Sequence, residues 1–150
     1  MGSTVYFTKD LSPDGLDKIF KRLNPTLGKN IAIKLHSGEK GNQNFLRPSF
    51  WQKLIDKLDG TVVECNTAYP GARNTTARHL KLMEEHEWAK YFKFDLLDAE
   101  ESDVVFDIPN GKVIKADYLG KNIVNYDSLL VLSHFKGHPM GGFGGALKQL

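Results

Sequence analysis

The sequence predicts an α/β domain with a mostly parallel sheet, helices on both of its faces and one antiparallel hairpin. Short runs of β-branched and other apolar residues alternate with segments of helical periodicity. This alternation is typical of parallel strands that are connected by helices. Two further β-rich segments flank Pro109-Asn110-Gly111 and predict the hairpin, because Asn-Gly suits a type I′ turn.

Turn and capping residues predict where most elements begin and end. Ser12-Pro13 marks the start of a first helix, because Ser caps helix N-termini and Pro is favoured at the first helical position. Asn24-Pro25 ends this helix, and Pro48 and Gly60 bound a second one. A third helix is expected over residues 75–88, strands over 5–8, 30–36, 61–66 and 128–135, and hairpin strands over 103–108 and 112–117.

Length and composition indicate one folded domain over residues 1–150. Hydrophobic residues make up 41% and charged residues 25% of the chain, as in ordinary globular proteins. No apolar run approaches the roughly 20 residues that span a bilayer, so no membrane association is expected. The 20 basic and 18 acidic residues are mixed along the chain without a basic stripe, so nucleic acid is not an expected partner.

The chain contains one cysteine, Cys65. A single thiol excludes an internal disulfide, a four-cysteine iron–sulfur cluster and a four-cysteine zinc site built by this chain alone. Cys65 lies within a predicted strand, where a small core residue is a simpler interpretation than a nucleophile. A cytoplasmic location is the corresponding expectation.

Polar residues follow three of the predicted strands. His36, Asn66 and His134 each fall at or near the carboxyl end of a strand, and loops rich in Gly, Asn, Arg or Lys come next. In open parallel sheets these ends form the crevice that binds ligands. Arg73 precedes a predicted helix and could hold a carboxylate or phosphate in bidentate fashion, or lie on the surface. His36 could instead satisfy backbone groups at the strand end.

The other histidines differ in their setting. His134 and His138 are four residues apart, across a strand end and a glycine-rich loop, and are candidates for binding a metal or an anion. His79 and His86 lie on the predicted third helix and are expected to be solvated.

Residues 137–148 form the most distinctive local pattern, with glycines concentrated after a buried strand. Glycine costs backbone entropy, which indicates close backbone approach to a ligand or positive φ angles. A helix that begins near Gly144 and Gly145 would also favour an anion at its N-terminus. The Gly-Lys-Ser/Thr of a phosphate-binding P-loop is absent, and a tight strand–helix turn is the alternative interpretation.

Several motifs in order resemble one protein family, from about residue 3 to the end of the chain. They occupy residues 31–42, 46–48, 66–73 and 133–148. The family is an uncharacterised domain that is often fused to ferredoxin-type iron–sulfur domains, and its members are usually called iron–sulfur centre proteins. Members usually continue past the position of Leu150, so the chain resembles the N-terminal part of the family domain, as a truncation or a shortened natural form. The resemblance implies an iron–sulfur cluster only in a longer member or a partner.

A shorter similarity concerns His138 and Lys148, on either side of Gly142-Phe143-Gly144-Gly145. The spacing of these two residues is similar to a motif of the nickel-pincer lactate racemases, in which a histidine is the acid and base and a lysine tethers the cofactor. The similarity implies that His138 would exchange a proton at a substrate carbon and that Lys148 would hold a cofactor. Arg47-Pro48 is similar to an Arg-Pro pair of the same enzymes, whereas their second catalytic histidine has no clear counterpart.

Three functions remain open from the sequence. The first is binding of a metal or a small anionic ligand at the strand ends, the second is an enzyme that abstracts a proton from a small carboxylate, and the third is a structural or interaction module. Under the third, apolar surface beside the last strand would favour a homo-oligomer or docking of an iron–sulfur domain. The candidate catalytic residues are His138 and Lys148, the candidate metal ligand is His134, and the candidate ligand-binding residues are His36, Arg47, Asn66, Arg73, Gly144 and Gly145.

Overall fold

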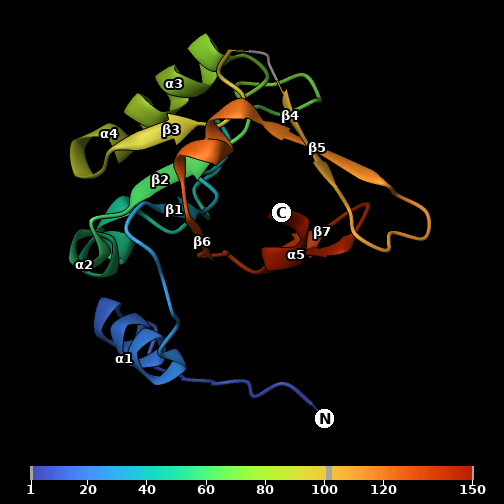
Figure 1. Cartoon of the computed structure of the whole chain (residues 1–150). Coiled ribbons are helices and arrows are strands. Elements are labelled where there is room, and N and C mark those ends of the chain that lie inside the picture. Colours follow the sequence, from blue (N-terminus) through green and yellow to red (C-terminus); the bar gives the residue numbers. More distant parts are fainter. Residues whose placement is uncertain (1, 101–102, 150) are drawn as a thin grey trace.

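The centre of the molecule is a four-stranded parallel sheet (Figure 1). The computed structural model describes residues 2–100 and 103–149. The strands are β1 (Ile31–Lys34), β2 (Thr61–Glu64), β3 (Phe94–Leu96) and β6 (Ser128–Val131), in the order β3-β2-β1-β6. Every neighbouring pair is parallel. The predicted α/β class with a mostly parallel sheet is therefore confirmed.

The first two helices begin and end where the capping residues predict. In α1 (Pro13–Leu23) the Ser12 hydroxyl accepts the N–H of Gly15, and Asn24 ends the helix in the left-handed conformation with φ 46°. In α2 (Pro48–Leu58) the left-handed residue is Asp59, with φ 47°, rather than Gly60. The N–H of Gly60 donates to the carbonyl of Ile55, which closes the helix end.

The third predicted helix is divided in two. It comprises α3 (Thr76–Glu85) and the single turn α4 (Trp88–Tyr91), separated by Glu87 with φ 65°. The break turns the chain so that the fully buried Trp88 donates its Nε1–H to the carbonyl of Ser37 at 3.0 Å. Burial of the indole with its polar N–H satisfied accounts for the interruption.

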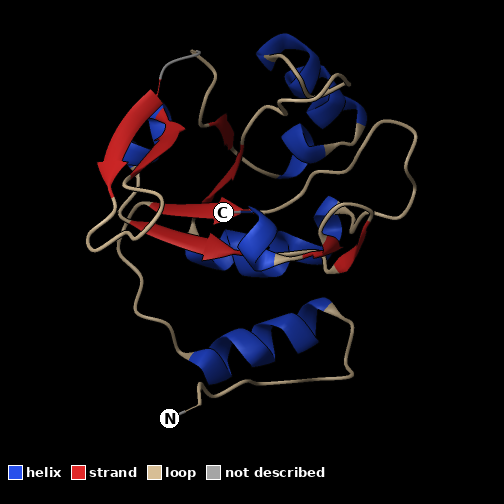
Figure 2. Cartoon of the chain, turned by 90° about the vertical axis from the view of Figure 1, so that its right-hand side faces the viewer, coloured by secondary structure: helices blue, strands red, loops and turns tan. Residues whose placement is uncertain are grey.

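Side-chain alternation in the strands defines the two faces of the sheet. Ile31, Ile33 and Val62 belong to the main core, together with residues of α2, α3 and α4. Ala32 and Val63 point to the opposite face and pack against Leu97, Ile123 and Tyr126. Ile123 belongs to the 3₁₀ helix η1 (Lys121–Asn125). Both views place α1 at the periphery, and it packs on α2 rather than on the sheet (Figures 1 and 2).

The predicted hairpin is present, with a different turn and register. It pairs β4 (Asp103–Asp107) with β5 (Ala116–Gly120), so the second strand begins four residues later than expected. Asn110 has φ 62°, Gly111 does not have positive φ, and the N–H of Gly111 donates to the carbonyl of Ile108. Since Pro109 fixes φ near −65°, the turn has the pattern of type II and not of the expected type I′.

Other expected segments differ from the structure. Residues 5–8 are not a strand, and their side chains at Val5 and Phe7 are exposed. The expected strand over 128–135 ends at Val131, and the chain then forms a second hairpin, β7 (Lys136–His138) with β8 (Gly142–Gly144), before the one-turn helix α5 (Ala146–Gln149). None of the helices in residues 2–100 and 103–149 is long and apolar enough to cross a membrane.

An acidic residue joins α1 to α2. Asp17 is 5% exposed, and its carboxylate contacts Lys21 at 2.7 Å and Lys57 of α2 at 2.9 Å. Hydrogen bonds from these two ammonium groups lower the pKa of Asp17 from 3.8 to about 2. The carboxylate therefore stabilises the fold above its unfolded-state pKa, and this stabilisation is lost as the pH falls.

We expect Asp17→Asn to lower the melting temperature by a few degrees at pH 7. The difference from the unsubstituted chain should shrink between about pH 4 and pH 2, because the native carboxylate is itself protonated there. Thermal melts monitored by circular dichroism at several pH values measure this effect. Asp56→Asn, an exposed position on α2, is the control, and an equal effect of both substitutions would contradict the role of Asp17.

The first hairpin exposes large apolar side chains, including Val105, Phe106, Val113, Ile114 and Tyr118. Self-association stays a prediction, and this surface is where we expect it. Light scattering at micromolar concentration should give a mass above that of one chain. Val113→Lys with Ile114→Lys should return the mass to that of a monomer, and a monomeric unsubstituted chain would refute the prediction.

Candidate functional site

The carboxyl ends of the parallel strands bring polar residues to one edge of the sheet. Glu64 ends β2, while His36 and Ser37 follow β1. Two loops, residues 37–44 and 67–74, cover this edge. The N–H of Thr67 donates to the carbonyl of Arg73 at 2.8 Å, which closes the second loop and returns Arg73 toward the sheet.

Glu64 is the buried charge on which this edge is organised. It is 3% exposed, and its Oε1 accepts the N–H of Ser37 at 2.6 Å. Its Oε2 lies 3.2 Å from Arg73 Nη1 and 3.9 Å from Lys34 Nζ. Burial by itself raises the pKa of Glu64, but Lys34 and Arg73 lower it below the ordinary value. The carboxylate is therefore charged and compensated inside the protein.

Arg73 connects Glu64 to a second carboxylate. Its side chain is 7% exposed, and Nη2 donates to Glu39 and, at 3.2 Å, to the hydroxyl of Tyr69. The Tyr69 hydroxyl in turn donates to Glu39 at 3.1 Å. Burial opposes the charge of Arg73, yet Glu39 and Glu64 raise its pKa above the ordinary value. The predicted alternative of a surface arginine is therefore wrong.

His36 lies half-buried beside this network. Burial is the main reason that its pKa falls from 6.5 to about 4, and Arg73 and Lys136 lower it further while Glu64 opposes them. The imidazole is consequently neutral near pH 7. A neutral ring can donate one hydrogen bond and accept another.

Two lysines approach the glycine-rich segment from different elements. A methyl group built on the buried Gly144 would lie 3.8 Å from Lys136 Nζ and 3.8 Å from Lys148 Cδ. Burial lowers the pKa of Lys136, and the charges of Lys148 and Arg73 lower it further. Gly142 has φ 73°, which explains one of the glycines. Because α5 has only four residues, the argument for an anion at its N-terminus loses its basis.

His134 and His138 lie close to this cluster in sequence but differ in environment. His134 is half-buried, and burial and Lys136 lower its pKa. His138 Nδ1 accepts the N–H groups of Met140 at 3.3 Å and Gly141 at 3.0 Å. In the part of the chain that the structure describes, no three His, Cys, Asp or Glu side chains form a group that could hold a metal ion.

Asn66 is engaged by its neighbours. Its N–H donates to Asp98 at 3.0 Å, and its side-chain amide donates to Thr76 at 3.1 Å. Its Oδ1 lies 3.3 Å from Nδ1 of His79, and His79 is fully buried. The expectation that His79 is solvated is wrong, because it completes this interior network. His86 is half-buried as well, and its Nδ1 donates to the carbonyl of Ser37.

Arg47 lies at a separate place. Its guanidinium stacks 4.1 Å from the centroid of the Phe45 ring and donates to Gln43. The Phe45 ring also stacks on the ring of His86. These side chains border a cavity of about 430 Å³ that also touches Tyr91.

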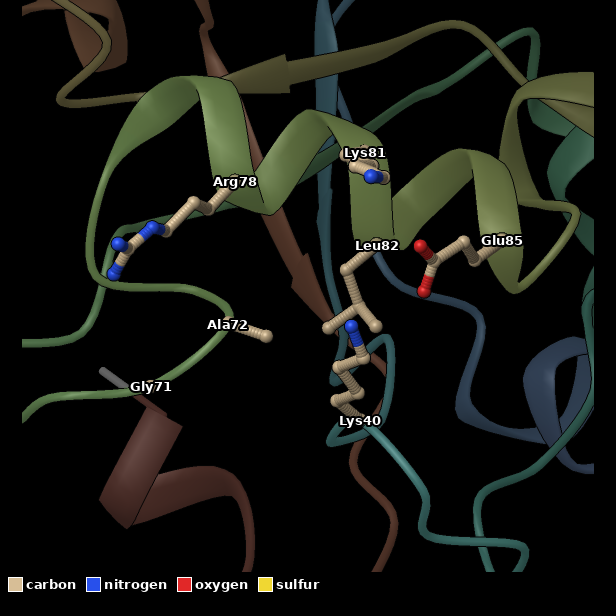
Figure 3. A pocket seen from close by; sticks show the side chains of 7 residues that line it. All are labelled: Lys40, Gly71, Ala72, Arg78, Lys81, Leu82 and Glu85. Carbon is tan, nitrogen blue, oxygen red and sulfur yellow. The ribbon is translucent and has the colours of Figure 1, made fainter.

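A second cavity, of about 340 Å³, lies against α3 (Figure 3). Lys40 reaches toward Leu82 from the loop after β1, while Arg78 and Lys81 extend from the helix. Lys40 adjoins Glu39 in sequence, so the same loop borders both the cavity and the buried network. The lining residues are Lys40, Gly71, Ala72, Arg78, Lys81, Leu82 and Glu85.

Comparison with known proteins gives a family and no described activity. The model of a domain of unknown function, DUF362, matches residues 31–150. The chain belongs to the DUF362 family. The match leaves α1 outside the family domain and includes every strand-end residue of the site. No curated protein and no solved structure matches the chain.

The thiol content of this DUF362 chain does not fit an iron–sulfur cluster. Its one cysteine, Cys65, is half-buried after β2. Burial raises the pKa of its thiol to about 11, whereas cluster ligation requires thiolates and commonly four of them. Cys65 packs beside Ala32 and Val63, in agreement with a small core residue.

Sequence reasoning missed five residues of the site: Lys34, Glu39, Glu64, Tyr69 and Lys136. A signal existed for two of them. Lys34 and Glu64 are charged residues within otherwise apolar strand segments, and such residues are rarely buried unless they are paired. Glu39, Tyr69 and Lys136 lie in polar loops or short strands where charge and hydroxyl groups are ordinary, so nothing in the pattern marks them.

We expect Arg73→Met to lower the free energy of unfolding by about 3–5 kcal/mol, because Glu64 is left as an uncompensated buried charge. The double substitution Arg73→Met with Glu64→Gln should recover a substantial part of this loss. Urea denaturation measures both effects. If the double variant is no more stable than Arg73→Met, the two side chains do not act as a pair.

Proposed function

We propose that this DUF362 domain binds a small anion with a carboxylate or phosphate group at the carboxyl edge of the sheet. The observation that carries the proposal is the convergence of Lys136 and Lys148 on the buried Gly144. One lysine belongs to β7 and the other to α5. β7, in which Lys136 is the cross-strand partner of Gly144, and α5 thus each bring one lysine side chain against this glycine.

The charge balance of the site supports an anion. Lys34, Arg73, Lys136 and Lys148 are the basic residues, and Glu39 and Glu64 are the carboxylates whose charges act on the first three of them. Within residues 2–100 and 103–149 no carboxylate lies within 4.0 Å of the Lys136 or Lys148 ammonium group. Like charges held together are unfavourable unless an anion neutralises them. His36 adds a neutral hydrogen-bonding group beside the excess of positive charge.

The two lysine side chains support the same ligand class. Both would be in van der Waals contact with a methyl group built on the buried Gly144. Lysine is a point charge with three rotatable donors, which suits phosphate or carboxylate oxygens in several orientations.

The proton-abstracting enzyme has less support. His138 would need a free ring lone pair to take a proton from carbon. Its Nδ1 lone pair already accepts two backbone N–H groups, which places the ring proton on Nε2. For this reason we propose binding, with Lys136 and Lys148 as the main contacts.

Anion binding should be measurable by isothermal titration calorimetry with inorganic phosphate and, separately, acetate. Lys136→Ala and Lys148→Ala should each weaken binding about tenfold, as expected for the loss of one charge-assisted hydrogen bond. Lys112→Ala, at the exposed turn of the first hairpin, is the matched control. Unchanged affinity in both site variants, with unchanged melting temperatures, would refute the site.

Native mass spectrometry with elemental analysis of the chain purified without a tag addresses the natural ligand. A bound mass that is lost in Lys148→Ala supports the proposal. A bound metal that is lost when His134 or His138 is changed to Ala would contradict the anion proposal and favour a metal site.

A further inference from the structure

The two carboxylates on Arg73 are held very differently. Glu64 is 3% exposed, ends a central strand and is also held by the N–H of Ser37 and by Lys34. The side chain of Glu39 is 38% exposed, and among the described residues its hydrogen-bond partners are Arg73 and the exposed Tyr69. Glu64 is therefore part of the fold, whereas Glu39 can leave at little structural cost.

The backbone around Glu39 can accommodate such a movement. Glu39 lies in a loop between Gly38, with φ 97°, and Gly41, with φ 78°. Apart from its chain neighbours, no described residue has a heavy atom within 4 Å of a methyl group built on Gly41, whereas Gly38 packs closely against the Phe45 ring. The Gly41 end of the loop is therefore the open one. Glycine at both positions permits backbone conformations that other residues avoid.

Arg73 retains an unused donor beside the one that Glu39 occupies. Its Nη1 donates to Glu64 and its Nη2 to Glu39 and Tyr69, but its buried Nε has no hydrogen-bond partner among the described residues. Nε and Nη2 form one edge of the guanidinium, and this edge matches two oxygens of a carboxylate or phosphate. Glu39 reaches one donor of that edge and leaves the other unsatisfied.

We propose that Glu39 is an internal substitute for the ligand, which displaces it from Arg73. The incoming carboxylate or phosphate takes both Nε and Nη2 of Arg73, and Glu39 moves out with its loop. This inference rests on the proposed anion site, because the charge of Arg73 acts on Lys136 and lowers the pKa of that lysine. It makes Arg73 the residue that recognises the ligand and makes Glu39 a built-in competitor that sets the affinity.

A competitor of this kind has a measurable effect on affinity. If Arg73 is free of Glu39 only a fraction of the time, the apparent dissociation constant is raised by the inverse of that fraction. Glu39→Gln removes the competing charge while it keeps the size of the side chain. We expect it to tighten binding of inorganic phosphate or acetate about tenfold, for a free fraction of about one tenth.

The test is calorimetric titration of the full chain with phosphate and with acetate, and the two series show which chemistry Arg73 prefers. Tyr69→Phe, which removes one hydrogen bond to Glu39, should tighten binding less than Glu39→Gln. Glu84→Gln, an exposed carboxylate on α3, should change nothing. Nitrogen-15 NMR of the Arg73 Nε–H group should show a chemical-shift change on ligand addition that matches the calorimetric affinity.

The outcomes separate this inference from the proposed function. Tighter binding in Glu39→Gln together with the NMR change supports the displacement. Unchanged or weaker binding in Glu39→Gln and Tyr69→Phe, with weaker binding still seen in Lys136→Ala, overturns the displacement and leaves the anion site. Failure of the unsubstituted chain and of all variants to bind either anion overturns both.

Discussion

The buried ion pair of Glu64 and Arg73 is the interaction on which the rest of the strand edge depends. A charge placed at the end of a central strand has lost its water, so the surrounding chain must supply hydrogen bonds and opposite charge. The N–H of Ser37 and the guanidinium of Arg73 do so from two different loops. One carboxylate thereby fixes the loop after β1 and the loop after β2 relative to each other.

This constraint also determines the chemistry that the edge can support. Once Arg73 is held by Glu64, its Nη2 reaches Glu39 of the loop after β1. Lys136 and Lys148 approach the same region, and burial keeps His36 neutral there. The proposed anion site therefore depends on where a few charged side chains are placed, because the whole chain carries a net charge of only +2. Overall composition gives little information about such a site.

Sequence reasoning reached the elements whose signals are local. The ends of α1 and α2 and the apolar strands β1 and β2 could be predicted from short stretches of sequence, because helix ends and buried strands depend on neighbouring residues. The three-residue strand β3 and the break at Glu87 could not, since β3 is ordered by pairing with β2 and the break by burial of Trp88. In the site, the strand-end rule pointed to the edge of the sheet where His36 lies, whereas the partners of Arg73 depend on how two loops meet in space.

The difference between Glu64 and Glu39 explains why an arginine is suited to this position. A lysine could neutralise Glu64, but it could not bind two separate carboxylates along two edges of one planar group. Under the proposed exchange, Arg73 serves the fold through Nη1 and the ligand through Nε and Nη2. Among the described residues Nε has no hydrogen-bond partner, which is unfavourable for a purely structural arginine and agrees with the proposed second role.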